Sequence, residues 1–358
     1  MPGDRPQQAR PTGQVSRPRT ANHSSVRTAL LRLLAAALAA VVGTSAAADE
    51  RIGLVLNWVP TADHAPYYFA RAQGWYRQAG LDVSIEIGKG SAVSAQRVGA
   101  GIAQFGIADL PTALVARGKG AAIAAVMVVY ANSPQGFYWL RSSGINGAKD
   151  FPGRRIGNPP GDAARIMWPA FARRAGIDPD GVIWVNVSPQ AKLASLKSRA
   201  IDITTDFYNE HDLKVREFGA DLGFLPWRST GLNPYGNSIL VNTDFLAAHR
   251  EAVRGFVQAT QRAFAACVKD AEPCLKALVA EASGLDLANQ RDQWQRVKEL
   301  MRDPTTEAVA LGAFNPQRLR EDYDLIRAQF GMDKPFDVDK VVVNDFLDTG
   351  IRMPREAP

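Results

Sequence analysis

Residues 51–88 read RIGLVLNWVPTADHAPYYFARAQGWYRQAGLDVSIEIG, and the order of patterns in them indicates the fold class. The apolar run RIGLVL at the start of this stretch predicts a buried strand that stops at Asn57. Residues 65–80 follow with a helical pattern that closes on Gly80, as helix C-termini commonly do. Residues 82–88 then alternate between apolar and polar side chains, which predicts a second strand. The order strand, helix, strand is typical of an α/β protein with a mostly parallel sheet.

The same alternation continues along the chain and then restarts, which predicts two lobes. After a final strand-like run, a helical block extends to about residue 302 without any strand, so it must dock on a lobe already built. We therefore expect two α/β lobes, each a mostly parallel sheet flanked by helices, with the second lobe inserted into the first. The expected boundaries are residues 49–140 with 238–358 for lobe 1 and residues 141–237 for lobe 2, with crossings near 137–143 and 235–242.

The N-terminal 48 residues have the features of an export signal. Arg27 and Arg32 flank the start of an apolar run, Leu33 to Val42, and small residues follow as far as Ala48. This is the order of a cleavable secretory signal, and the run is too short to span a bilayer. We predict that residues 1–48 are a signal peptide and leader, cleaved near Ala48, and that the mature protein is exported. A membrane anchor or an unstructured tail are the alternatives.

The charge of the chain gives no indication of a nucleic-acid partner. The formal net charge is +6, and residues 1–48 hold six Arg against one Asp, which leaves 36 basic and 35 acidic residues in the remainder. The mature part contains no basic run with interleaved aromatic residues, so the electrostatic footprint of a nucleic-acid-binding protein is missing.

Cys267 and Cys274 are the two cysteines of the chain. In an oxidising compartment a local disulfide between them is expected, and two buried free thiols are the alternative. A metal site is not expected, because no histidine accompanies them.

Candidate ligand-binding residues follow the predicted strands. In open α/β sheets ligands bind beyond the carboxyl ends of the strands, and the residues there combine aromatic faces with a few hydrogen-bonding groups, as small-molecule sites do. The candidates are Asn57, Trp58, His64, Tyr67, Asp109, Asn158, Gly161, Asp162, Ser188, Asp206, Tyr208 and Tyr235.

Each candidate has a structural alternative. Trp58 could cap the core, His64 could serve only a local hydrogen bond, and an aspartate just before a helix could be its N-cap. The turn GNPPGDAAR opens a helix whose free N–H groups could hold an anion, although it lacks the spacing of a dinucleotide or P-loop motif. Motifs of metalloproteases, nucleophile-elbow hydrolases and paired CxxC sites do not occur in the sequence.

The sequence resembles the thiamine-pyrimidine-precursor, sulfonate and nitrate group of ABC transporter substrate-binding proteins. The resemblance covers roughly residues 51–347, and it is carried by LNWVPTADHAPYYFARAQGWYRQAGLDVSIE, QFGIADLPTALVARGKG, GRRIGNPPGDAA and the tail FNPQRLREDYDLI…DKPFDVDKVVVNDFL. It implies a periplasmic-binding-protein fold of type II, with a ligand cleft between two lobes. It also implies that Trp58 stacks on the ligand and Asn57 forms a hydrogen bond with it.

The same group includes fungal synthases that make the pyrimidine from a pyridoxal cofactor and one of their own histidines. Aligned through GIADLPTALVARGKG, their cofactor lysine falls on Ala108 and their consumed histidine on Thr112. Their cysteine-rich iron motif has no counterpart here, and an export signal does not suit that chemistry. We therefore expect no synthase activity, no cofactor and no metal.

The resulting hypothesis is a periplasmic, monomeric solute-binding protein that delivers its ligand to an inner-membrane ABC permease with its ATPase. The expected ligand is a small aromatic nitrogen heterocycle, such as a thiamine pyrimidine precursor. An alkylsulfonate, taurine or another small anion is the alternative within this class. An exported enzyme or a sensor that feeds a membrane receptor are alternatives of other classes.

Overall fold

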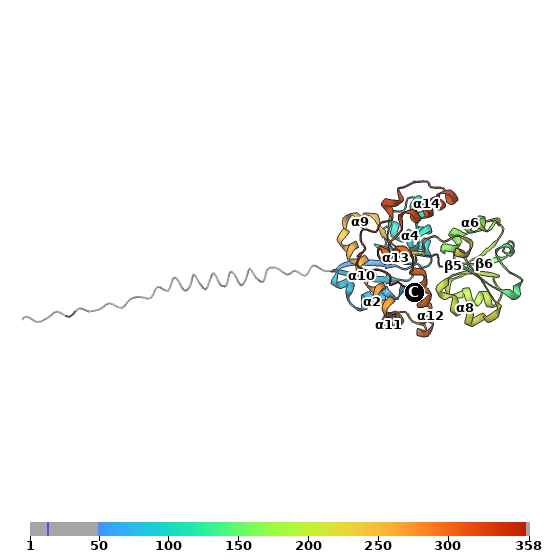
Figure 1. Ribbon diagram of the computed structural model, residues 1–358, viewed down its shortest axis with the longest axis horizontal. Coiled ribbons are helices and arrows are strands. Elements are labelled where there is room, and N and C mark those ends of the chain that lie inside the picture. The colour runs from blue at the N-terminus through green and yellow to red at the C-terminus, as the bar shows by residue number, and fades with distance from the viewer. Residues whose placement is uncertain (1–12, 14–48, 356–358) are drawn as a thin grey trace, which may run out of the picture. The chain divides into compact units, whose positions relative to one another are not determined.

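The computed structural model describes residue 13 and residues 49–355. The predicted signal peptide and leader lie outside the described residues apart from Gly13. Residues 49–358 form one compact unit (Figure 1). Within the part that the structure describes, no helix combines the length and apolar character needed to cross a membrane.

The first lobe is built on a five-stranded mixed sheet in the order β2-β1-β3-β10-β4. β1 pairs in parallel with both β2 and β3, whereas β10 runs antiparallel to β3 and β4. The expected parallel sheet is therefore interrupted by one strand that the chain supplies late, on its return from the second lobe. The strands are β1 (Glu50–Val55), β2 (Leu81–Glu86), β3 (Phe105–Asp109), β4 (Ile123–Val128) and β10 (Asn237–Asn242).

The second lobe repeats this arrangement in the order β7-β6-β8-β5-β9. β6 pairs in parallel with β7 and β8, and β5 runs antiparallel to β8 and β9. In each lobe the antiparallel strand is thus the one that directly follows a crossing. The strands are β5 (Gln135–Leu140), β6 (Arg155–Gly157), β7 (Ile183–Val185), β8 (Ile203–Phe207) and β9 (Leu222–Pro226).

The pairing of β5 corrects the expected boundary of the first lobe. Gln135–Leu140 was assigned to lobe 1, but every residue of this strand pairs within the second sheet. The crossing therefore lies before Gln135 rather than near 137–143. The apolar run GFYWL fits a buried strand in either sheet, so its hydrophobicity could not assign it to a lobe.

Two short segments, 129–134 and 227–236, connect the lobes. They are hydrogen-bonded to each other, because Gly236 N donates to Tyr130 O at 2.9 Å and Ser133 N donates to Asn233 Oδ1 at 2.8 Å. The C-terminal helices support them: Asp322 Oδ2 accepts the N–H of Tyr235 at 3.0 Å. The connection between the lobes is therefore a pair of irregular segments that are hydrogen-bonded to each other and supported by a C-terminal helix.

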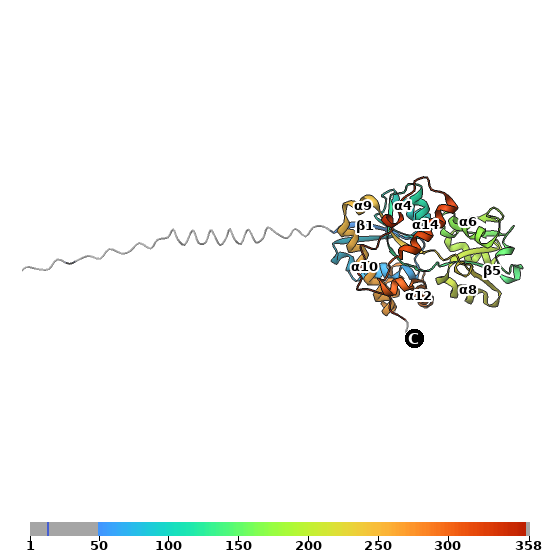
Figure 2. The same ribbon diagram turned by 45° about the horizontal axis from the view of Figure 1, so that its top comes forward.

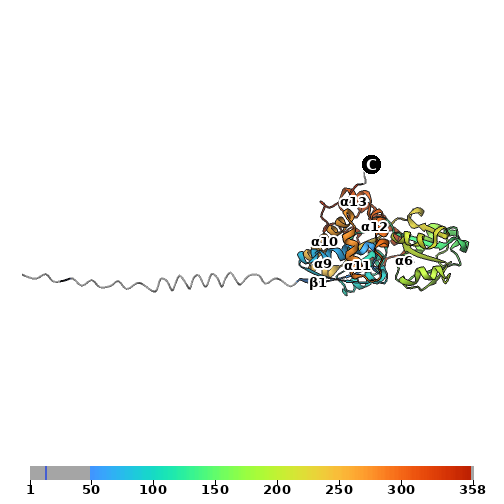
Figure 3. The ribbon, with the colours of Figure 1, turned by 90° about the horizontal axis from the view of Figure 1, so that it is seen from below.

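Helices cover both sheets, and the late helices dock on the first lobe. Figures 1, 2 and 3 all place α6 apart from α9 and α10, and Figures 1 and 2 place α8 on the same side as α6. Phe256 of α10 stacks on Phe105 of β3, with ring centroids 3.9 Å apart, and on Tyr76. The α-helices are α2 (Ala65–Ala72), α3 (Trp75–Gln78), α4 (Ser91–Gly99), α5 (Leu110–Gly118), α6 (Ala163–Ala175), α7 (Lys192–Lys197), α8 (His211–Phe218), α9 (Thr243–Ala248), α10 (Arg250–Lys269), α11 (Glu272–Glu281), α12 (Leu287–Met301), α13 (Pro304–Ala308), α14 (Pro316–Phe330) and α15 (Val338–Val341).

The structure joins Cys267 and Cys274 in a disulfide. Cys267 lies near the end of α10 and Cys274 in the first turn of α11, and both are buried. The bond fixes the corner between these two helices, both of which pack on α2 directly after the first strand.

Candidate functional site

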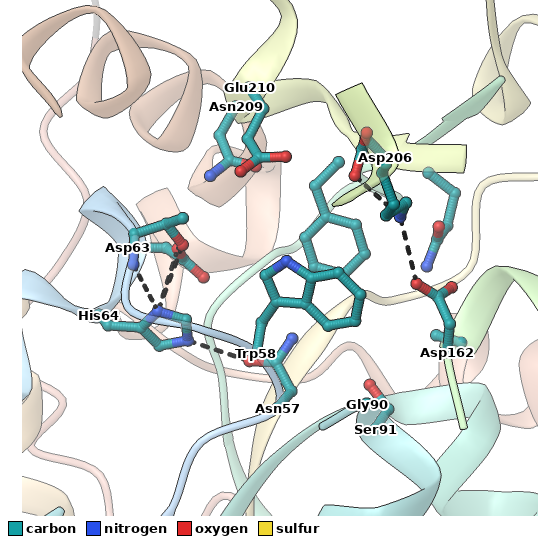
Figure 4. Close-up of a pocket in the computed structure, with 15 residues that line it drawn as sticks. Asn57, Trp58, Asp63, His64, Gly90, Ser91, Asp162, Asp206, Asn209 and Glu210 are labelled. Atoms are coloured by element: carbon teal, nitrogen blue, oxygen red, sulfur yellow. Dashed lines mark hydrogen bonds and ion pairs between the residues drawn. The ribbon is translucent and has the colours of Figure 1, made fainter. Parts of the chain in front are cut away.

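A pocket lies between the two lobes (Figure 4). Its walls come from the ends of β1, β5 and β8 and from the helix starts that follow in each lobe. The lining residues are Asn57, Trp58, Thr61, Asp63, His64, Gly90, Ser91, Gln135, Asp162, Ala163, Lys192, Asp206, Phe207, Asn209 and Glu210.

Two glycines let the first-lobe wall close tightly around the end of β1. Gly88 N donates to Trp58 O at 3.1 Å and Gly90 N donates to Asn57 O at 2.7 Å. Gly90 has a φ of +116°, and a Cβ there would lie 2.4 Å from the carbonyl oxygen of Gly161 in the second lobe. A side chain at this position would therefore force the lobes apart.

A buried network of hydrogen bonds organises the first-lobe side of the cavity. His64 Nδ1 accepts the N–H of Thr61 at 3.1 Å, which leaves the proton on Nε2 to be donated to Asn57 Oδ1 at 3.0 Å. Asn57 Nδ2 donates to Asn237 Oδ1, and Asn237 Nδ2 donates to Asp63 Oδ2, both at 3.1 Å. Burial lowers the pKa of His64, so the neutral imidazole that this pattern requires is the stable form at neutral pH.

On the second-lobe side a buried carboxylate is held between two lysines. Lys192 Nζ lies 2.9 Å from Asp206 Oδ1, and Lys214 Nζ lies 2.9 Å from Asp206 Oδ2. Burial by itself raises the pKa of Asp206, but the two ammonium groups outweigh it and hold the pKa below its ordinary value. The same balance raises the pKa of Lys192: burial opposes the charge, and Asp206 and Asp162 outweigh burial. Asp206 and Lys192 are therefore both charged at neutral pH.

Glu210 is the carboxyl group of the cavity whose proton exchanges near neutrality. Burial raises its pKa to about 6, although Lys214 lies 3.6 Å away. The Asp206 charge adds to the effect of burial.

Trp58 provides an aromatic surface in the middle of the cavity. Figure 4 shows its indole between Asp63 and His64 on one side and Asp162 and Asp206 on the other. The Nζ atom of Lys192 lies 4.8 Å from the centre of the Trp58 ring, within the range of a cation–π contact between the lobes. This arrangement offers an aromatic face next to both donors and acceptors of hydrogen bonds.

The structure brings five of the predicted site residues together in the cavity wall and leaves seven out of it. Their contact with a ligand stays a prediction. The five are Asn57, Trp58, His64, Asp162 and Asp206.

Three of the other candidates lie behind the cavity, in the interior of the lobes. Tyr67 is buried in the core against the edge of Phe264. Asp109 lies behind the lining residue Gln135, and its Oδ2 accepts a hydrogen bond from Gln135 Nε2 at 3.1 Å. Tyr235 is fully buried, and its hydroxyl accepts the N–H of Asn315. Of the three, only Asp109 ends a strand; Tyr67 lies on α2, and Tyr235 precedes β10 at the return crossing.

Four second-lobe candidates also lack a place in the wall. Asn158 donates to Thr205 Oγ1 inside the lobe, and Gly161 O accepts the N–H of Ala92 in a contact between lobes. Ser188 is exposed at the start of a short 3₁₀ turn. Tyr208 stacks on Phe224 away from the lining.

Sequence reasoning missed the most consequential wall residue, Lys192. It lies in the run QAKLASLKSRA, which predicts a solvated helix, and nothing local indicates that this lysine is 2% exposed. Asn209 and Glu210 could have been found, because a 3₁₀ turn over residues 208–210 directly follows β8 and continues the strand end. Asp63 lies in the quoted stretch beside His64, where only the histidine was selected.

The family model described as NMT1/THI5 like matches residues 61–273 of this chain. The match spans more than half of the chain and includes most of the cavity wall. The chain belongs to the NMT1/THI5-like family. The two lobes are those of a periplasmic-binding-protein fold, which the similar solved structures share.

The relatives of this NMT1/THI5-like protein include binders and enzymes. The riboflavin-binding protein RibY of Chloroflexus aurantiacus is 24% identical over 84% of this chain and 87% of its own length. A 4-amino-5-hydroxymethyl-2-methylpyrimidine phosphate synthase of Legionella pneumophila is 27% identical over 60% of this chain and 68% of its own. The alkanesulfonate-binding protein SsuA of Xanthomonas axonopodis pv. citri, solved with bound MOPS, has a TM-score of 0.66 at 16% identity and covers 84% of this chain and 99% of its own.

These comparisons support a role in binding a small solute, at the level of the family. One of these relatives is named as a synthase.

Proposed function

We propose that this protein is the periplasmic solute-binding component of an ABC importer and captures a small, flat nitrogen heterocycle such as a thiamine pyrimidine precursor. The ligand would stack on Trp58 and present amino groups to the surrounding carboxylates. Closure of the lobes over it would create the form that the permease recognises.

The observation that carries this proposal is the composition of the wall around Trp58. The lining residues include four acidic side chains, Asp63, Asp162, Asp206 and Glu210, and one lysine. Carboxylates in a water-poor cavity accept hydrogen bonds and lower the energy of positive charge, and an indole face attracts flat rings. A neutral or protonated aminopyrimidine satisfies both features.

The same composition disfavours an anion such as a sulfonate or nitrate. The helix start at Asp162, which could have held an acid group, is capped by that aspartate, whose Oδ1 accepts the N–H of Ala164 at 2.8 Å. An anion there would lie beside a carboxylate, and like charges repel strongly in a buried site.

Binding without turnover is proposed because the positions that serve the synthase chemistry hold other residues. Ala108 and Thr112 occupy the positions of the cofactor lysine and the consumed histidine, and both are buried in the first lobe. Neither side chain can form the covalent bond or supply the atoms that this reaction needs. A receptor-feeding sensor would use the same cavity, and it differs from an importer subunit only in its partner.

The experiment that tests this function is a ligand screen on residues 49–358 by thermal shift, followed by calorimetry. The panel contains 4-amino-5-hydroxymethyl-2-methylpyrimidine, thiamine, riboflavin, taurine, an alkylsulfonate and nitrate. A ligand at 100 times its Kd adds about 2.7 kcal/mol to the free energy of unfolding. The resulting thermal shift is large enough for the screen to detect. Stoichiometric binding of an aminopyrimidine without product supports the proposal. A shift with sulfonate or nitrate alone, or turnover of a bound compound, contradicts it.

A further inference from the structure

Two lysines share one carboxylate in the second lobe, but only one of them reaches the cavity. Lys192 and Lys214 each lie 2.9 Å from a different oxygen of Asp206, and both are almost completely buried. Each also has its ammonium 4.8 Å from the centre of an aromatic ring. For Lys214 that ring is Tyr138, within the second lobe, whereas for Lys192 it is Trp58, in the opposite lobe.

Asp206 itself is poorly placed to receive a ligand. Both of its oxygens already face an ammonium group, so a ligand amino group would compete with a charged partner at each of them. In the structure its closest charged partners are the two lysines.

Lys192 retains hydrogen-bonding capacity toward the cavity. An ammonium group has three N–H donors. Asp206 Oδ1, 2.9 Å from Nζ, can accept one of them, and the distance from Nζ to Asp162 Oδ2 is 3.6 Å, which is too long for a good hydrogen bond. Nζ lies 4.8 Å from the centre of the Trp58 ring, so the other donors are available beside the aromatic surface that a flat ligand would contact.

We infer that Lys192 is a specificity-determining residue whose ammonium donates to a hydrogen-bond acceptor, a ring nitrogen or carbonyl oxygen, on the ligand ring that lies on Trp58. This inference rests on the proposed function and deepens it, because it names a second requirement for the ligand. The ring must carry an acceptor for Lys192 as well as amino groups for the carboxylates. Asp206 is then a positioning residue that holds Lys192 in place.

The physical basis of this selectivity is the cost of an unpaired buried charge. A ring that carries C–H groups in place of its acceptors would cover the ammonium without accepting its proton. Sites built to hydrogen-bond a ligand reject analogues that lack the partner atom by large factors, because the buried polar group of the site is left unsatisfied.

The test compares two ligands of the same shape. The probes are 4-amino-5-hydroxymethyl-2-methylpyrimidine and 2-amino-4-methylbenzyl alcohol, which has C–H at both ring-nitrogen positions. For the wild-type chain, calorimetry should give an affinity ratio of roughly 100-fold or more in favour of the pyrimidine. In Lys192→Met the ratio should fall below about 10-fold, because the ammonium that discriminates is gone.

Lys214→Met is the matched control. It leaves the same Asp206 with one lysine, at the same burial, so its loss of stability should resemble that of Lys192→Met while its ring preference stays at the wild-type value. If the carboxylate left behind prevents Lys192→Met from folding, the double variant Lys192→Met/Asp206→Asn removes both charges and should show the same loss of preference. Asp206→Asn alone removes the carboxylate that holds Lys192 charged and in place, so its ring preference should fall as well.

The outcomes separate this inference from the function on which it rests. Loss of the preference in the Lys192 variants but not in Lys214→Met supports the assignment. If Lys192→Met binds the pyrimidine and discriminates as well as the wild type, the role of Lys192 is overturned and the proposed function stands. If the wild type binds neither probe, both fall together.

Discussion

Asn57 Nδ2 lies 3.1 Å from Asn237 Oδ1, and these two amides join the strand that begins the first lobe to the strand by which the chain returns to it. Both residues are buried, at 3% and 0% exposure. Asn237 O also accepts the N–H groups of Val129 and Tyr130 in the first crossing segment, at 2.7 and 3.1 Å. One residue therefore ties together the cavity wall and the connection between the lobes.

Replacing Asn237 should destabilise the fold, because buried polar groups that now form hydrogen bonds with it would lose their partner. Asn237→Ala deprives the amide of Asn57 and the carboxylate of Asp63 of a buried partner each, so we expect a loss of about 2–4 kcal/mol in the free energy of unfolding. Urea denaturation measures it. Asn146→Ala, in an exposed loop, should change the value by less than about 0.5 kcal/mol. A similar small loss in Asn237→Ala would show that the network adds little.

Removing the indole of Trp58 should weaken binding of the aminopyrimidine. By analogy with measured stacking of bases on aromatic side chains, Trp58→Ala should cost on the order of 1–3 kcal/mol of binding free energy, and Trp58→Phe less. Calorimetry measures both. Trp75→Ala, a tryptophan that packs on Phe69 outside the cavity, is the control and should keep the affinity. An unchanged Kd in Trp58→Ala would place the ligand elsewhere.

The affinity for an aminopyrimidine should fall as the pH drops through about 6. Burial raises the pKa of Glu210 to about 6, so its carboxylate is available as an acceptor above that pH and is protonated below it. The groups that face Glu210 are Lys214, Asp206 and Lys192, and Asp206 and Lys192 keep their charges in this range. In Glu210→Gln the step near pH 6 should disappear. The free pyrimidine also titrates, so its pKa is measured first and the affinities are corrected for its protonation. A step of equal size in the wild type and in Glu210→Gln would contradict the assignment to Glu210.

Asp109 should make the protein less stable as the pH rises from 4 to 7. Burial raises its folded-state pKa to about 7, despite the hydrogen bond from Gln135. Above pH 3.8 the unfolded chain releases this proton while the folded protein retains it, so stability declines until the pH passes 7. Asp109→Asn removes this contribution, on the order of 4 kcal/mol. The variant should gain stability relative to wild type at pH 8 and match it at pH 4, as urea midpoints at the two values would show.

Two arginines connect α8 of the second lobe with α12 of the first. Arg216 of α8 lies 2.5 Å from Asp292 of α12, and Arg296 of α12 makes two hydrogen bonds to Asp212 of α8, at 2.9 and 3.1 Å. Exposed ion pairs contribute about 0–1 kcal/mol each, so removing both should shift the equilibrium toward the open form by up to roughly 30-fold. Small-angle X-ray scattering without ligand should show a larger radius of gyration for Arg216→Gln/Arg296→Gln.

The control for this prediction is Arg291→Gln. Arg291 makes a comparable pair of hydrogen bonds, both 2.8 Å, to Glu272, but donor and acceptor lie in the same lobe. Its radius of gyration should therefore equal that of the wild type. An unchanged radius in the double variant, or an equal increase in the control, would show that these arginines do not hold the lobes together.

The residues predicted after strand ends reach the cavity more often in the first lobe than in the second. At the end of β1 the prediction selected Asn57, Trp58 and His64, all of which line the cavity, because a long apolar strand followed by polar residues marks this edge clearly. In the second lobe β6 and β7 are three residues long, and of the candidates there only Asp162 and Asp206 reach the wall. Short strands give little periodicity to fix where they end or which way the next side chain points.

The sequence by itself determined the family, the α/β class and the aromatic and polar residues that follow the first strand. These depend on local patterns, since a strand, its turn and the following helix are contiguous in the chain. The tertiary structure decided that β5 pairs in the second sheet, that Asp206 faces two lysines, and that Lys192 of one lobe lies over Trp58 of the other. These relationships join residues far apart in the chain. The first two depend on packing within the second lobe and the third on how the two lobes meet, and no local pattern of side chains encodes either.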